Sequence, residues 1–388
     1  MTILNSPGNL SSVSNEMIFV VEDAKSLDPI TYPNYKYIAD VYVDGELKAR
    51  LRATPDPAYS FGRFDVSVIL RDYVPAYGLK ANYASESEEY DIKKAYTIKF
   101  GEEYGDTLYT NVLVDSEREF VKTYAARPFL TSDIITDVTH GIASNMPTIM
   151  TGYKSEKWKI IPGYSNASGV LFEYGVIGSD PSGGGLIAND SIVYSGQDNI
   201  NQFNIGFQKL IGNLSLDQGD INDAVQVTFS LDDLGSYIIN LVCSKYTPVN
   251  LAWLNPYGAY ESQSFGLVSK RTNEITRKDY AQLSYQMNSS GVISYDSDGV
   301  MYGSKKGYAA TTKASMALTS HLLTDAEYTW LADLFSSPDV YFFSDTLDRW
   351  VPCTIQDNNY EYRTYKNSRL KTLQFTINYT DSYNSQYL

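Results

Sequence analysis

The chain has 388 residues, enough for two or three domains that each bury a core of their own. Its 46 Asp and Glu outnumber 31 Lys and Arg, which gives a formal net charge of -15. A negative field of this size repels phosphate backbones and anionic lipid, so neither direct nucleic-acid binding nor a membrane surface is expected. Only two His accompany 34 Tyr, a composition that favours β-strands and packing contacts over proton-transfer catalysis.

Targeting signals and disulfides are not expected. Residues 1–10 have no basic start and no apolar run, which argues against a signal peptide, and no stretch reaches the roughly 18 apolar residues of a spanning helix. Cys243 and Cys353 each lie in an apolar, strand-like stretch. We therefore expect two buried free thiols in a protein made in a reducing cytoplasm.

The N-terminal third is predicted to be a flexible arm followed by a β-sandwich. Residues 1–16 are small, polar and turn-forming, which predicts the arm. Alternating strands over Tyr35–Val43 and Glu46–Ala53 flank an Asp-Gly dipeptide, the strongest short-range signal for a hairpin. Asp65 is placed to cap a short helix or turn. Further short strands predict an immunoglobulin-like sandwich over residues 17–126.

The middle of the chain is predicted to be a connector and a second sandwich. Periodicity weakens over residues 127–163, where three prolines interrupt the chain, so an irregular connector is expected there. Strands resume and predict a second β-sandwich over residues 164–262. The glycine-rich loop Gly178–Gly185 lacks the Lys-Ser/Thr pair of a phosphate-binding loop and no helix follows it, so nucleotide binding is not expected.

The last region, residues 263–388, is predicted to be a β domain with one packed helix. Thr324 and Glu327 have the spacing of a capping box, and Trp330 begins an apolar stripe that ends before Pro338. This pattern predicts a helix over residues 324–337. The fold class is accordingly mainly β, with tandem immunoglobulin-like β-sandwich domains and a C-terminal β domain that carries one α-helix.

The sequence has no motif that identifies a catalytic or metal site. His140 and His321 stand far apart, and no cysteines are paired at metal-binding spacing. His321 directly precedes the predicted helix and is interpreted as a helix-entry residue. A Gly-x-Ser-x-Gly nucleophile elbow is absent. We therefore assign no catalytic, cofactor-binding or metal-binding residues and expect no enzyme activity.

Paired acids leave one enzymatic alternative open, because a glycosidase needs only two carboxylates brought together by the fold. The candidate pairs are Glu102–Glu103, Asp232–Asp233 and Asp296–Asp298. All three stand beside Gly or Ser at apparent turns, where solvated acids are expected. The last pair also begins like a calcium loop, but Lys305–Gly307 stands where the bidentate Glu should follow.

A basic patch follows the middle of the chain. It begins at Lys270-Arg271 and ends at Arg277-Lys278, and the acidic Glu274 and Asp279 interrupt or adjoin it. Mixed charges of this kind favour a solvated face or an interface over nucleic-acid binding.

Three stretches, taken in order, resemble a known group of virion proteins. They are YKYIADVYVDGELKARLRATPDP with FGRFDVSVILRDYV, then WLNPYGAYESQSF, and finally LTDAEYTWLADLFSSPDVYFF with VPCTIQD. In this order they are similar to tail, baseplate or tail-ring proteins of phages and prophages of Bacteroidota hosts, including crAss-like phages. The resemblance implies a virion component of the tail, made in the bacterial host cytoplasm and present in a symmetric ring of copies.

The resemblance carries over structural positions and partners but no catalytic residues. It implies a strand-to-turn corner at Trp253, Leu254, Asn255 and Gly258, with Trp253 in a core or subunit contact, and it implies that the segment 64–66 (Phe-Asp-Val) closes the first sandwich. The implied partners are other copies of the chain and other tail, portal-proximal or baseplate proteins.

Two other functions stay open at this point. A receptor- or glycan-binding tail protein would expose Trp or Tyr side chains that stack on sugars. A polysaccharide depolymerase would bring two of the carboxylates together.

Overall fold

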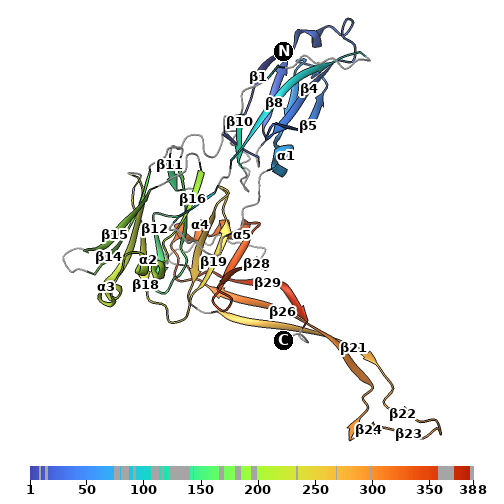
Figure 1. The fold of residues 1–388 in the computed structure, drawn as a ribbon, viewed down its shortest axis with the longest axis vertical. Helices are drawn as coiled ribbons and strands as arrows, with labels where there is room; N and C mark the ends of the chain where they lie inside the picture. The colour runs from blue at the N-terminus through green and yellow to red at the C-terminus, as the bar shows by residue number, and fades with distance from the viewer. Residues whose placement is uncertain are drawn as a thin grey trace.

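The computed structural model describes residues 1–7, 10–13, 16–73, 79, 87–90, 93–105, 113–114, 118–121, 140–142, 144–165, 170–179, 185–193, 199–232, 235–267, 269–297, 299–356 and 371–384. These residues form a mainly β structure, as the sequence predicts, while the immunoglobulin-like topology stays a prediction. Figure 1 shows an N-terminal unit, a central unit and a C-terminal unit, with a long β-ribbon that projects from the C-terminal unit.

Two sheets form the N-terminal unit. The smaller sheet has the strand order β1 (Thr2–Asn5), β3 (Ile18–Glu22), β6 (Gly62–Asp65). The larger sheet has the order β2 (Leu10–Ser12), β10 (Arg118–Val121), β8 (Lys93–Glu103), β4 (Lys36–Val43), β5 (Glu46–Ala53), with β9 (Leu113–Val114) beside β8. Phe19 from the smaller sheet and Phe100 from the larger lie 5.6 Å apart between ring centroids, so the two sheets share one core.

The predicted hairpin and the predicted cap are both confirmed. Strands β4 and β5 pair antiparallel, and their turn residues Asp44 and Gly45 have φ angles of 54° and 76°. Positive φ at both central positions matches the right-handed strand twist, which explains the Asp-Gly pair. Asp65 Oδ1 accepts hydrogen bonds from the backbone N–H of Ser67 (3.0 Å) and Met17 (3.1 Å), and so holds the start of α1 (Ser67–Leu70). Phe64 and Val66 are buried beside it.

The prediction of a flexible arm over residues 1–16 is wrong. Strand β1 pairs with β3, and β2 pairs parallel with β10. The Met1 amine lies 2.8 Å from Asp23 Oδ2, and Val13 is fully buried. The few apolar residues in this polar stretch suffice because sheet edges elsewhere in the unit supply both backbone partners and a hydrophobic face.

One strand encoded inside the predicted first domain leaves it. Strand β7 (Ser87–Tyr90) pairs antiparallel with β16 (Asn199–Asn204) of the central unit, and Leu79 packs against a small cluster that contains Ile160 and Trp350. The chain then returns to the N-terminal unit as β8. Residues 17–126 are therefore not a self-contained sandwich, because part of the segment completes a distant sheet.

The central unit also contains two sheets. One has the order β11 (His140–Ile142), β13 (Ile160–Ser165), β16, β7. The other has the order β12 (Ile149–Tyr153), β18 (Tyr237–Val242), β17 (Ala224–Leu231), β14 (Leu171–Gly178), β15 (Leu186–Val193). Two short helices, α2 (Phe207–Asn213) and α3 (Gln218–Asp223), join β16 to β17. The stacked rings of Phe172 and Phe203, 3.8 Å between centroids, join the two sheets.

The predicted connector over residues 127–163 is wrong in its second half. Strands β11, β12 and the start of β13 lie there, and β12 pairs parallel with β18. Residues 127–139 lie outside the described part of the chain. The strand signal was missed because Gly152, Gly163 and the prolines of this stretch break the alternation, although the fold uses these positions for close contacts; a Cβ at Gly152 would stand 2.6 Å from Ile239.

The C-terminal unit is built on one seven-stranded sheet. Its order is β20 (Tyr260–Phe265), β19 (Val249–Leu254), β27 (Val340–Ser344), β28 (Arg349–Ile355), β29 (Gln374–Asn384), β26 (Lys305–Thr319), β21 (Lys270–Ala281). Because β19 and β20 belong here, the predicted boundary between residues 262 and 263 is wrong. One hydrophobic cluster includes both Phe172 of the central unit and Phe375 of this sheet, so the two units share a core.

The predicted helix over residues 324–337 is present in two pieces, α4 (Asp325–Trp330) and α5 (Ala332–Ser336). The capping box is confirmed: Glu327 N–H donates to Thr324 Oγ1 (3.2 Å), and Thr324 N–H donates to Glu327 Oε2 (2.8 Å). Trp330 packs against Trp253 of β19 with ring centroids 5.3 Å apart. The helix thereby covers one face of the sheet.

The two cysteines are both free thiols, but only one is buried. Cys353 lies in β28, where burial raises the pKa of its thiol to about 12. Cys243 is exposed because it lies just beyond the last residue of β18, so its predicted burial is wrong. A bilayer-spanning helix is not found in the described ranges, where α2, with seven residues, is the longest α-helix.

The burial of Val13 leads to a stability prediction. Val13→Ala is expected to lower the free energy of unfolding by about 2 kcal/mol, because it removes two buried methyl groups and leaves a cavity. Leu4→Ala, at a side chain that is 47% exposed, is the matched control and should change it by less than about 0.5 kcal/mol. Urea unfolding of the full chain measures both. Equal, small effects would restore the idea of a loose N-terminal arm.

Candidate functional site

The strand β20 is polar and yet completely buried. Its central residues Glu261, Ser262, Gln263 and Ser264 are at most 2% exposed, although β20 is the terminal strand of its sheet. A buried polar strand is stable only when its side chains and its free backbone edge find hydrogen-bond partners. The central unit supplies those partners from β12, from the start of β13 and from the segment between them.

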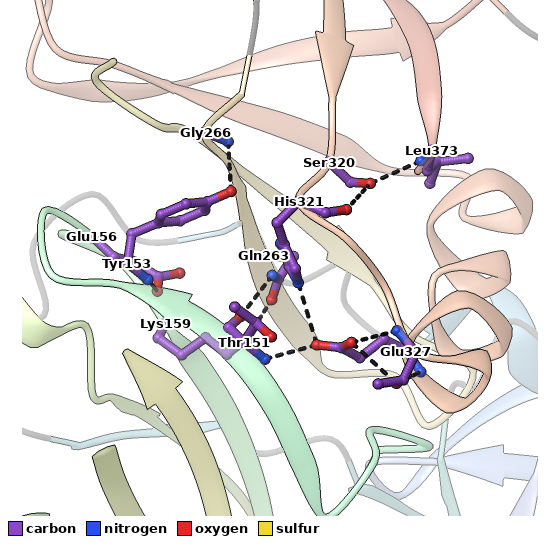
Figure 2. A network of polar contacts seen from close by, with 11 residues as sticks. Thr151, Tyr153, Glu156, Lys159, Gln263, Gly266, Ser320, His321, Glu327 and Leu373 are labelled. Carbon is purple, nitrogen blue, oxygen red and sulfur yellow. Dashed lines mark hydrogen bonds and ion pairs between the residues drawn. The ribbon is translucent and has the colours of Figure 1, made fainter. Parts of the chain in front are cut away.

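Figure 2 shows this network at the junction of the two units. Ile160 N–H donates to Ser262 Oγ (2.7 Å), Gln263 Nε2 donates to the carbonyl of Thr151 (3.2 Å), and Gly266 N–H donates to the hydroxyl of Tyr153 (3.3 Å). Burial raises the pKa of Tyr153 to about 12, so its hydroxyl stays protonated at neutral pH. Hydrogen bonds as well as apolar contacts therefore hold the central and C-terminal units together at this junction.

Lys159 is the buried cation of the network. Its side chain is 1% exposed, its Nζ donates to Gln263 Oε1, and the same Nζ lies 5.1 Å from the ring centroid of Trp330. Burial lowers the pKa of Lys159, while Glu156, Glu327 and Glu261 oppose that shift. A cation over an indole face and beside three acids is well compensated, so the desolvation cost is offset locally.

Two buried acids complete the same cluster. Glu156 Oε1 accepts from Ser264 Oγ (2.7 Å), and burial raises the pKa of Glu156 against the opposing charge of Lys159. Glu327 Oε1 accepts from Thr151 N–H (2.7 Å) and lies 3.3 Å from His321 Nε2. The helix cap of α4 is thus also a bond to the central unit. His321 stands at the helix entry, as predicted, and additionally contacts this carboxylate.

Glu261 is a third buried acid and lies within β20, two residues from Gln263. Its oxygens accept from Trp330 Nε1 (3.0 Å), from Ser144 Oγ and from Asn255 Nδ2 (3.4 Å). These donors favour the charged form, but burial outweighs them and raises the pKa of Glu261 to about 7. The group therefore titrates near neutral pH inside the folded protein.

The chemistry available to this cluster is structural. Buried ionisable groups with shifted pKa values often mark catalytic sites. Here Glu156, Lys159, Glu261 and Glu327 are each at most 2% exposed and His321 is 7% exposed, so a dissolved substrate does not reach them in this conformation. The four charged side chains are instead bonded to backbone and side chains of both units, among them Thr151 and Gln263 across the junction and Trp330 within the C-terminal unit. The cluster joins two units.

The carboxylate pairs singled out from sequence do not form paired sites where the structure describes them. Glu102 is 1% exposed and bonds to Tyr35 (3.1 Å) and Lys25, which corrects its predicted solvation at a turn. Glu103 is the next residue of β8, points to the opposite face and pairs with Arg52 at 2.9 Å. Neighbours on one strand therefore cannot act on one substrate.

The remaining candidates are separated or fall partly outside the described residues. Asp232 follows β17 with a φ of 49°, and Asp296 opens the short strand β24 (Asp296–Ser297). Asp233, Asp298 and most of the loop Gly178–Gly185 are not described. His140 begins β11 rather than lying in an irregular connector. Within the described ranges, no group of three or more His, Cys, Asp or Glu is arranged to hold a metal ion.

The corner implied by the resemblance is confirmed as a structural element. Asn255 Oδ1 accepts from the backbone N–H of Tyr257 (3.0 Å) and Ala259 (3.1 Å), directly after β19 ends. Gly258 has a φ of 85°, which explains why glycine stands there. Trp253 is fully buried against α4, so it fills a core rather than a subunit contact.

The second notable feature is a projecting ribbon, here defined as residues 270–310. It consists of β21, the tip with the short strands β22 to β25 (Gln286–Met287, Ile293–Ser294, Asp296–Ser297, Val300–Met301) and the first part of β26. Strand β29 pairs with β26 only from Thr311 onward, so the ribbon beyond that point is two-stranded. Figure 1 shows it extending away from all three units.

None of the described residues in the ribbon is buried, yet many are apolar. The exposed large apolar side chains are Ile275, Tyr280, Leu283, Met287, Val292, Ile293, Tyr295, Val300, Met301 and Tyr308, between 45% and 78% exposed. An isolated two-stranded ribbon is marginal in water, and a contiguous exposed apolar surface usually marks an interaction site. The ribbon therefore exposes more apolar side chains than a two-stranded segment can cover by itself.

Sequence reasoning found part of this feature and missed the rest. The basic patch was interpreted as a solvated face or an interface, and β21 carries it with every residue exposed. The projection itself was missed, although the stretch from Leu283 to Met301 contained a signal: short apolar pairs separated by Ser, Asn and Gly give no continuous core-facing pattern.

No model of a known protein family matches this chain, and no curated protein matches it at a significant level.

The buried Glu261 leads to a pH prediction. Because its pKa is about 7 in the folded protein and near 4.5 otherwise, the folded state binds an extra proton between these values, and stability contributed by this group is lost as pH rises toward 7 and above. Glu261→Gln should therefore gain stability relative to wild type between pH 5 and pH 8, by up to roughly 3 kcal/mol. Urea unfolding at both pH values measures the difference. A pH-independent difference would contradict it.

The pair Glu156 and Lys159 allows a double-mutant test of the junction. Lys159→Met alone should cost about 3 to 5 kcal/mol of stability, because it leaves buried acids without their cation. Combining it with Glu156→Gln should cost less than the sum of the two single changes by more than about 1 kcal/mol. Chemical unfolding of the four proteins gives the coupling. Simple additivity would show that the two side chains do not interact.

Proposed function

We propose that this chain is a structural subunit of a bacteriophage tail or baseplate, present in a ring of copies and located in the virion. The single observation that carries the proposal is the ribbon, which exposes apolar side chains over its length and buries none of its described residues. A protein that functions alone gains nothing from such a segment, whereas an assembly subunit buries it against a neighbour. The resemblance of the three sequence stretches to tail and tail-ring proteins supports the same reading.

The buried polar junction between the central and C-terminal units is a second observation that supports the proposal. A subunit that transmits load between neighbours needs its units held at a fixed angle, and directional bonds from Glu327 and Lys159 hold the central and C-terminal units together. The most perturbed acids and the buried lysine are used for this purpose. Assembly, rather than covalent chemistry, is the function that these contacts favour, with other tail, portal-proximal or baseplate proteins as further partners.

The ribbon also favours one second candidate, binding of a host glycan. Tyr280, Tyr295 and Tyr308 are each 45% or more exposed on the ribbon, and tyrosine rings stack on sugar faces. This function predicts that the isolated chain binds host surface polysaccharide and loses binding when the ribbon is shortened. The assembly function predicts no such binding.

A ribbon-shortened variant tests the main proposal. Residues 278–309 are replaced by Asn-Gly, which closes a two-residue turn between the paired residues Arg277 and Ala310. Since no described residue of the removed segment is buried, the melting temperature should change by less than about 3 °C. Incorporation into particles, measured by mass spectrometry of purified virions from cells that express only this variant, should be lost.

The wild-type chain expressed in the same way is the control, and a map of its particles should show a ring of copies. Normal incorporation of the shortened variant would show that the ribbon is not needed for assembly. Absence of the wild-type chain from purified particles would refute the proposed function itself.

A further inference from the structure

The ribbon and the rest of the chain carry opposite charge. Residues 270–310 contain six Lys and Arg against four Asp and Glu, a formal net charge of +2 within a chain of -15. Four of the six basic residues lie along a short stretch of the two strands: Arg277 and Lys278 on β21, and Lys305 and Lys306 on β26, which pair with Ala281 and Tyr280. The ribbon therefore presents positive charge between apolar side chains, and it would bind best to a surface that is acidic and partly apolar.

The central unit has such a surface. Residues 140–243, from the start of β11 to the residue after β18, contain ten Asp and Glu against four Lys, a formal net charge of -6, whereas residues 1–126 mix 20 acidic with 13 basic side chains. No other region described above combines so much negative charge with so little positive charge. A positively charged partner is attracted to this unit before contact and held there after it.

The outer strands of the central unit add the apolar component. Leu171, Leu186 and Val193 are 36%, 60% and 61% exposed, and the acids Glu173 and Asp190 are exposed beside them. Leu171 pairs directly with Val193, and Glu173 with Ser191, so Leu171, Glu173 and Val193 share the outer face of β14 and β15. Asp190 pairs with Tyr174 and lies on the opposite face of the same edge strand, where its side chain is exposed. We call these five residues, Leu171, Glu173, Leu186, Asp190 and Val193, the β15 patch.

Both surfaces also lie at open sheet edges. Strand β15 is the last strand of the five-stranded sheet, and β21 is the last strand of the seven-stranded sheet. An edge strand offers unpaired backbone groups to another strand, and nothing in the described part of the chain covers these two edges. Backbone pairing is therefore available in addition to the charge and apolar contacts.

The two surfaces cannot meet within one molecule. Figure 1 shows β15 at the outer side of the central unit, while the ribbon extends from the far side of the C-terminal unit in the opposite direction. A contact between them must join two copies. Because the two surfaces differ, the contact is head-to-tail, and such contacts form a ring when the rotation between successive copies closes.

We propose that the ribbon of one copy binds the β15 patch of the next copy. The inference deepens the proposed function and rests on it, because it names the contact by which the ring would form. Complementary charge selects the partner, and burial of the ribbon's apolar side chains against Leu186 and Val193 stabilises the contact.

Charge reversal on each side tests the proposal. One variant carries Lys278→Glu with Lys306→Glu in the ribbon, a second carries Glu173→Lys with Asp190→Lys in the patch, and a third carries all four changes. A control variant carries Lys245→Glu with Asp72→Lys, two exposed positions outside both surfaces. Self-association of the purified full chain is followed by sedimentation over a range of protein and salt concentrations.

Each single-surface variant should raise the apparent dissociation constant at least about tenfold, and the four-fold variant should recover most of the loss. The control should match wild type, and added salt should weaken wild-type association. Unchanged association in both single-surface variants would overturn the docking surface while leaving the ring intact. Loss without recovery in the four-fold variant would likewise show that the two surfaces do not face each other.

A cross-link in assembled particles covers the case in which the purified chain stays monomeric. Met287→Cys in the ribbon and Val193→Cys in the patch are combined with Cys243→Ser, which removes the exposed native thiol. Oxidation of purified virions should produce a ladder of dimers and higher species, and either cysteine alone should not. Particles that contain the chain without such a ladder would overturn the contact, whereas particles without the chain would refute the proposed function. Ribbon-dependent binding of DNA in place of self-association would also overturn the contact.

Discussion

The structure depends on hydrogen bonds to the polar side chains of β20, because this strand is buried away from water. Strand β20 brings two acids of different roles close together: Glu261 lies within it, and Glu156 of the facing unit bonds to its Ser264. Hydrogen bonds that the sheet cannot supply come from the central unit and, for Glu261, also from Trp330 of α4 and from Asn255. Leaving even one of these groups unpaired would cost far more than the bond contributes, so the two units are committed to a single relative position.

This fixed relative position explains why one hydrophobic core runs through the central and C-terminal units, between which the sequence predicts a domain boundary. Apolar contact alone tolerates sliding, because it is not directional, whereas the bonds from Lys159 and Glu327 specify register. With β19 and β20 held on one side, the seven-stranded sheet has a fixed orientation. The ribbon at the opposite side of that sheet consequently points in a fixed direction from the central unit.

Local signals in the sequence predicted local structure well. The Asp44-Gly45 turn, the Thr324 capping box and the corner at Asn255 each satisfy their backbone groups within a few residues, so the pattern alone identifies them. Pairings between distant segments could not be read in this way. Glycines hid β12, and the polar residues of β20 gave no sign of burial, since their partners lie more than a hundred residues away in sequence. The candidate site failed to emerge for the same reason.

The placement of β7 affects how the protein is made. Residues 87–90 leave the ribosome long before Asn199–Asn204, the strand with which they pair, has been synthesised. During translation this short segment must wait without its partner, while the flanking strands β4 and β8 can already join. Since the β7–β16 pairing must form across more than a hundred residues before the central sheet is complete, we expect it to form late in folding.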